Sequence, residues 1–301
     1  MVPFGTVHLL LLIASSHGAL SPARRARPVV ARSPSGSSAP LLKLRGGLLN
    51  IDAEKFSLIP LTLFGLQGAY STLAPADAAE MYGRSVSEGS VQYHMLQQSG
   101  LCYLTQALVI IKAMGGMPVA EAVGWGMVPW CLLGAKNILQ DTPGLPTRGK
   151  YIPATAILLF ALGCFGKLPL LDAATTLKVM TVWNAVNGLV AYFAPQVFAS
   201  SYGVDDSDAL LSDTKAFGAA ITGSAIIFAG FSFLNKTPLE TLGLLMSAYF
   251  LALADSEFVT KWGAGMGMTE GKMIPWMALQ GLTALTIFTG GKGGGEVSVR
   301  N

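Results

Sequence analysis

The chain has 301 residues, of which 51% are hydrophobic and 12% are charged, and its formal net charge is +3. Roughly a quarter of the residues of an average soluble domain are charged, so this composition indicates a membrane protein whose main partner is the lipid bilayer. The first acidic residue is Asp52, which places much of the positive charge in the N-terminal segment. The basic balance is therefore no indication of a nucleic-acid partner.

Residues 1–47 have the composition of a targeting leader. The apolar run at residues 7–14 is too short to cross a bilayer, which takes about 20 apolar residues, and small residues follow it. This pattern predicts a signal peptide at residues 1–19. Residues 20–47 contain six basic residues, many Ser, Ala and Pro, and no acid, a composition typical of transit peptides.

Together the two parts resemble the bipartite presequence of proteins sent into complex plastids of the red algal lineage. The resemblance implies a plastid membrane, either the thylakoid or the envelope. The alternative is a protein of the endomembrane system or plasma membrane with a basic N-terminal extension.

After the leader, the chain contains eight apolar segments of membrane-spanning length, which predict an all-α, polytopic membrane protein. The segments lie at residues 56–75, 91–114, 118–139, 151–171, 177–198, 215–234, 238–254 and 273–289. The segment at 238–254 is short, and the one at 91–114 is interrupted by Gln97, Gln98 and Gln106. Seven spans is therefore the alternative count.

Blocks of similar residues return about 120 positions later in the chain. Gln67-Gly68 corresponds to Asn187-Gly188, Ala74-Pro75 to Ala194-Pro195, and Gly149-Lys150 to Gly271-Lys272. Several blocks in the same order at a nearly constant offset indicate a duplication. The sequence predicts two tandem four-helix repeats, at residues 48–170 and 171–290, followed by a flexible glycine-rich tail at residues 291–301.

The even number of helices per repeat predicts that both repeats enter the membrane from the same side. The pseudo-twofold axis between them then lies along the membrane normal. The loops at residues 76–90 and 199–214 share the face opposite the termini and are mainly acidic, with Arg84 as their basic residue. The positive-inside rule therefore predicts that the termini face the stroma or the cytosol.

Three amides are the strongest candidate site residues. Gln67 and Asn187 occupy equivalent positions of the two repeats, and Asn184 lies on the same helix face as Asn187. Amides related by a twofold axis would face each other across the centre of the bundle, where they would contact a polar substrate or a pigment. The alternative, which the sequence favours, is a hydrogen bond between helices, worth about 0.6 to 2 kcal/mol.

His94 is the one histidine that follows the leader, so the usual histidine-rich zinc sites and bis-histidyl haem are excluded. It is a candidate axial ligand for a chlorophyll magnesium, or else an interfacial side chain. Lys150 and Lys272 each precede a helix at equivalent positions, where free N–H groups and a lysine suit a lipid phosphate. The alternative is a lysine that extends to the membrane interface. No other cofactor is evident, although a carotenoid or a lipid fits the composition.

No catalytic motif appears in the chain, and the middles of the spans lack charged residues, which argues against an ion-driven pump. We therefore expect a non-catalytic scaffold or accessory subunit of a plastid membrane complex. One alternative is a facilitator of a small uncharged solute that passes through the repeat interface along the three amides. A membrane-embedded lipid enzyme is the third.

Overall fold

The computed structural model describes residues 52–140, 147–200, 208–268 and 270–290. The predicted leader and the glycine-rich tail lie outside these residues. Within them the structure contains helices and no strand, which confirms the prediction of an all-helical protein. The long helices are α2 (Ala53–Leu73), α4 (Val91–Met114), α5 (Val119–Leu139), α6 (Thr147–Cys164), α7 (Ala173–Phe193), α9 (Asp208–Ser232), α10 (Pro238–Ala254) and α12 (Glu270–Gly290).

Short helical elements follow three of the long helices. They are α3 (Pro75–Glu80), α8 (Pro195–Ser200), the π-helix η1 (Asp255–Val259) and α11 (Trp262–Gly265). The sequence predicted that the first and fifth apolar segments run through Pro75 and Pro195, but both helices end before these prolines. Ala74 and Ala194 leave the helical conformation, with φ of −135° and −132°. Each proline then begins a new helix, a position where its missing N–H costs nothing.

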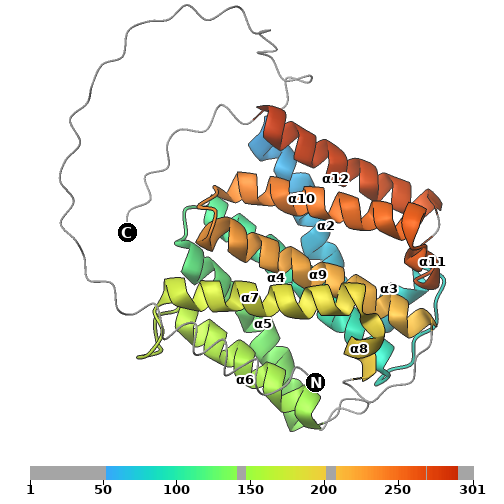
Figure 1. The fold of residues 1–301 in the computed structure, drawn as a ribbon, viewed down its shortest axis with the longest axis horizontal. Coiled ribbons are helices and arrows are strands. Elements are labelled where there is room, and N and C mark those ends of the chain that lie inside the picture. Colours follow the sequence, from blue (N-terminus) through green and yellow to red (C-terminus); the bar gives the residue numbers. More distant parts are fainter. Residues whose placement is uncertain (1–51, 141–146, 201–207, 269, 291–301) are drawn as a thin grey trace, which may run out of the picture. The chain divides into compact units, whose positions relative to one another are not determined.

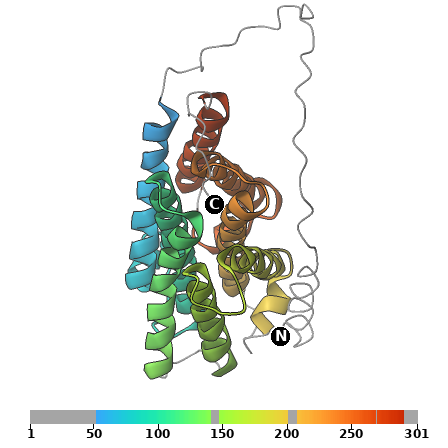
Figure 2. The same ribbon diagram turned by 90° about the vertical axis from the view of Figure 1, so that its left-hand side faces the viewer.

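The long helices form a closed cycle in chain order (Figure 1). Each contacts the next, from α2 through α4, α5, α6, α7, α9 and α10 to α12, and α12 returns to contact α2. Helices α4 and α9 also contact each other across the cycle. Figure 2 shows the helices from the first half (blue and green) largely on one side and those from the second half (yellow to red) on the other.

Glycines allow two helix pairs to approach closely. Gly68 of α2 faces Gly100 of α4, and a Cβ built on Gly68 would lie 2.7 Å from the Gly100 carbonyl oxygen. Gly188 of α7 faces Gly218 of α9 in the same way, and a Cβ on Gly218 would lie 2.9 Å from the Gly188 carbonyl oxygen. Both distances are too short for any side chain, so these contacts require glycine.

Two helical stretches of the described residues are long and apolar enough to cross a membrane by length and composition alone, Leu210–Ser232 and Pro238–Val259. Two such stretches are weak evidence, because the core helix of a soluble protein passes the same test and Leu210–Ser232 is 67% buried. The other long helices fall below that standard: the apolar part of α6, Lys150–Cys164, is too short, and α4, for example, carries four glutamines. The finer prediction of eight spans therefore stays a prediction.

Asp172 caps the N-terminus of α7, where its Oδ1 accepts a 2.6 Å hydrogen bond from the Thr175 amide. This backbone hydrogen bond lowers the pKa of Asp172 below its ordinary value. We expect Asp172→Ala to reduce the free energy of unfolding by about 1 kcal/mol at neutral pH. Because the native pKa is depressed, this contribution is present above the unfolded pKa and is lost as the pH falls through the native pKa.

Unfolding followed by circular dichroism, at neutral pH and at about pH 3, measures the contribution of Asp172. Asp172→Asn is the matched control, because asparagine keeps a capping oxygen and removes only the charge. Equal stability of the wild type and Asp172→Ala at neutral pH would contradict the prediction.

Candidate functional site

The three candidate amides line two separate cavities rather than facing each other. Gln67, on α2, lines a cavity of about 140 Å³, here called the first cavity. Asn184 and Asn187, on α7, line a second cavity of about 120 Å³. The structure thus brings Asn184 and Asn187 together and keeps Gln67 apart from them.

The amide nitrogens of these residues bond within their own helices. Gln67 Nε2 donates to Ser71 Oγ at 3.1 Å. Asn184 Nδ2 donates to the Met180 carbonyl and Asn187 Nδ2 to the Trp183 carbonyl, both at 2.8 Å. Each of these bonds uses one N–H of its amide within α2 or α7, so it does not join two helices, which was the alternative that the sequence favoured.

Gln106 of α4 is the amide that connects helices. It is 1% exposed, and its Nε2 donates to the Ala220 carbonyl at 2.7 Å and to Ser224 Oγ at 3.1 Å, both on α9. Its Oε1 accepts a 2.8 Å hydrogen bond from Tyr249 Oη on α10. The sequence marked Gln106 only as a polar interruption; the available signal was a mid-helix amide in an apolar segment, which needs partners on other helices.

Aromatic rings form much of the wall of the first cavity. The Phe64 ring stacks on Tyr249 at a centroid distance of 5.3 Å and meets the edges of Tyr103 at 5.5 Å and Trp276 at 6.1 Å. These four side chains come from α2, α10, α4 and α12 and line the first cavity together. Helices from both halves of the chain therefore line the cavity.

Gln280 is the second amide of the first cavity, and the sequence did not single it out. It lies in α12 and is 4% exposed. Within the described part of the chain, its Oε1 has no hydrogen-bond partner. Most buried polar atoms have such a partner, so this oxygen is a candidate ligand contact.

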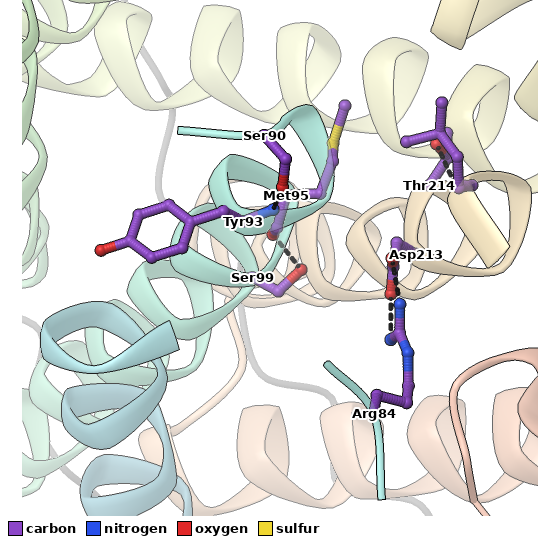
Figure 3. A network of polar contacts seen from close by, with 8 residues as sticks. Arg84, Ser90, Tyr93, Met95, Ser99, Asp213 and Thr214 are labelled. Atoms are coloured by element: carbon purple, nitrogen blue, oxygen red, sulfur yellow. Dashed lines mark hydrogen bonds and ion pairs between the residues drawn. The ribbon is translucent and has the colours of Figure 1, made fainter. Parts of the chain in front are cut away.

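An ion pair lies beside the first cavity (Figure 3). Arg84, in the segment after α3, donates from both terminal nitrogens to the two carboxylate oxygens of Asp213 on α9, each at 2.6 Å. The Asp213 side chain is fully buried and that of Arg84 is 12% exposed. The ion pair links the segment after α3 to α9, and the Asp213 carboxylate neutralises the charge of Arg84.

The remaining candidates lie elsewhere. His94 is 3% exposed at the start of α4, with its ring 5.6 Å from that of Tyr93, and it is not among the residues that line either cavity. Lys150 is buried in the first turn of α6. Lys272 Nζ donates to the Met81 carbonyl at 3.2 Å and lies 5.4 Å from the centre of the Tyr82 ring.

The contacts of Lys272 fasten the start of α12 to the end of α3. Burial raises the pKa of Tyr82, so the ring beneath the ammonium group remains a neutral phenol at physiological pH. The lipid-phosphate role of Lys150 and Lys272 stays a prediction, as does the pigment role of His94.

Among the described residues, no group of three or more His, Cys, Asp or Glu side chains is arranged to hold a metal ion. The chain's cysteines, Cys102, Cys131 and Cys164, are free thiols on three different helices. Comparison with protein-family models, with curated proteins and with solved structures finds no match to this chain. The function must therefore be inferred from the chain itself.

Proposed function

We propose that this protein is a polytopic membrane protein, built from two tandem four-helix repeats, that acts as a non-catalytic scaffold or accessory subunit in a larger membrane complex. The observation that carries the proposal is the apolar outer surface of the bundle. From Phe56 to Leu73, the exposed residues of α2 are Leu58, Ile59, Thr62, Leu63, Leu66, Tyr70 and Leu73. A soluble monomer rarely exposes so continuous an apolar face.

Other long helices support the membrane part of the proposal in the same way. Along α12, large apolar side chains are exposed at Ile274, Leu282, Leu285 and Phe288, and along α6 at Tyr151, Ile152, Leu158 and Leu159. Helices of 21 residues, such as α2, α7 and α12, are about 30 Å long, which matches the hydrocarbon thickness of a bilayer.

Corresponding local features support the two repeats. Asp52 caps α2 and Asp172 caps α7, 120 positions apart. The helix-ending residues Ala74 and Ala194 have the same spacing, as do Gly68 and Gly188 at the close helix contacts. The contact of α6 with α7 also has its counterpart in that of α12 with α2. These pairs suit a pseudo-twofold axis between α4 and α9, along the membrane normal.

The scaffold role rests on the contrast between a tightly packed interior and an apolar exterior. Tight glycine contacts and the Gln106 hydrogen bonds hold the bundle together internally. The apolar outer faces remain available to contact lipid, pigments such as chlorophyll or carotenoid, and partner subunits. The plastid location rests on the composition of the leader, and it is part of this proposal.

A facilitator of a small uncharged solute is the second candidate, favoured by the two amide-lined cavities. The facilitator role predicts a continuous path between the two cavities. Because the amides lie in separate cavities and Gln106 fills the contact between α4 and α9, the scaffold is the better-supported role.

Extraction of native membranes tests the proposal. We expect the protein to stay with membranes washed in alkaline carbonate and, after mild-detergent extraction, to migrate on a native gel within a larger, pigmented assembly. Release into the carbonate wash would contradict the membrane-spanning bundle. A small colourless band would contradict the accessory subunit and favour the facilitator.

Paired amide variants separate the two roles. Gln67→Leu combined with Asn187→Leu removes one amide from each cavity and leaves the outer apolar faces intact. A scaffold with these changes still assembles. A facilitator keeps its fold and loses solute flux, measured in vesicles that contain the purified protein.

A further inference from the structure

The first cavity contains a hydrogen-bond acceptor that the protein leaves unused. Gln280 is 4% exposed, lines the cavity and, within the described residues, presents an Oε1 without a partner. A buried acceptor without a donor loses its hydration and gains nothing in return. A ligand that donates a hydrogen bond would compensate for that loss, so the unpaired Gln280 Oε1 points to a donor group on the ligand.

The size and walls of the cavity define the rest of the ligand. Apolar cavities of about 150 Å³ hold a molecule the size of benzene, and the first cavity measures about 140 Å³. Phe64, Tyr103, Tyr249 and Trp276 surround it with aromatic rings. Offset-stacked or edge-to-face contacts with such rings favour a flat, apolar ring in the ligand.

The charges around the cavity favour a neutral ligand. Arg84 is the charged residue among those that line it, and both of its terminal nitrogens bond to Asp213. An anionic ligand would have to compete with the fully buried Asp213 carboxylate, and a cationic one would meet the arginine. Gln67 and Tyr249 are committed, since Gln67 donates to Ser71 and Tyr249 to Gln106. Trp262 Nε1, which also lines the cavity, has no hydrogen-bond acceptor among the described residues, and a hydroxyl on the ligand could serve as one.

We propose that the first cavity is a binding site for a neutral molecule with one apolar ring that carries a hydroxyl or N–H donor. The ring lies among the four aromatic side chains, and the donor bonds to Gln280 Oε1. A free phenol-like compound and the ring end of a longer lipid share this chemistry. The site goes beyond the scaffold role and does not depend on it.

Fluorine NMR of the full-length protein in detergent tests the site, with 4-fluorophenol and 4-fluoroanisole as probes. The two rings are similar in size, but only the phenol donates a hydrogen bond. We expect the phenol to bind about tenfold more tightly, the equivalent of one hydrogen bond to a buried acceptor. Gln280→Leu should lower phenol affinity about tenfold, and leave anisole affinity within about twofold.

Asn187→Leu, which changes an amide of the second cavity, is the matched control and should leave the preference for phenol unchanged. Gln280→Met gives a second variant of different shape, should the leucine variant fail to fold. Equal binding of both probes by the wild type, no binding of either probe, or a phenol preference that survives both Gln280 variants would overturn the proposal.

Competition with a long-chain 4-alkylphenol identifies the source of the ligand. Much tighter binding of the alkylated compound than of phenol, beyond its partition into detergent, assigns the site to the ring end of a lipid. Equal binding assigns it to a small free molecule. Migration on a native gel reports the scaffold role separately, so failure of one proposal is distinguishable from failure of the other.

Discussion

Gly68→Ala is expected to lower the free energy of unfolding by about 2 kcal/mol or more. The added Cβ would lie 2.5 Å from the Leu104 amide nitrogen and 2.7 Å from the Gly100 carbonyl oxygen. Both are backbone atoms of α4, which cannot rotate away as a side chain can. The methyl group must therefore push α2 and α4 apart along their whole contact. Unfolding in a denaturing detergent, followed by circular dichroism, measures the loss.

Gly65→Ala is the matched control, less than one helical turn away on α2. Its added Cβ would meet only the Ala107 Cβ at 3.6 Å, an ordinary van der Waals distance. Alanine also has the higher helix propensity, by about 1 kcal/mol, so this variant should be neutral or more stable. Equal destabilisation by the two substitutions would show that the close approach of α2 and α4 does not cause the loss of stability in Gly68→Ala.

Arg84→Met is expected to lower the free energy of unfolding by about 3 to 5 kcal/mol. The substitution leaves the fully buried carboxylate of Asp213 without its cationic partner. It also releases the segment after α3 from α9. The same detergent-induced unfolding experiment measures the change.

The double variant Arg84→Met, Asp213→Leu removes both charges and should recover much of that loss, because replacing a whole buried pair with apolar groups is often nearly neutral. Lys236→Met is the surface control, since Lys236 and Glu240 have side chains that are 42% and 45% exposed. Its effect should stay below about 1 kcal/mol. A double variant as unstable as Arg84→Met would contradict the unpaired-charge explanation.

Helix positions followed from local chemistry that the sequence displays. The predicted segments at 91–114 and 238–254 have the bounds of α4 and α10. Ser90 caps α4 by accepting from the Tyr93 amide, and Thr237 begins α10 with a capping box that includes Glu240. Such signals lie within a few residues of the helix end, so a sequence pattern contains all of them.

Partners far apart in the chain were not predictable in this way. Tyr249 and Gln106 are separated by 143 positions, and Arg84 and Asp213 by 129. Which face of a helix meets which neighbour depends on the packing of the whole bundle. The sequence for this reason predicted wrongly that the amides Gln67 and Asn187 face each other. In the structure α4 and α9, rather than α2 and α7, make the main contact across the cycle.

The closed cycle also sets an order for biosynthesis. Among the described helices, α2 is the first long one to emerge, yet one of its two neighbours in the cycle, α12, is the last to be made. The side of α2 that receives α12 must therefore be covered by lipid or by a chaperone until α12 has been synthesised. Any factor that delays the insertion of α12 would leave the contact between α2 and α12 unformed. Phe64 and the other aromatic side chains next to this contact would then be uncovered.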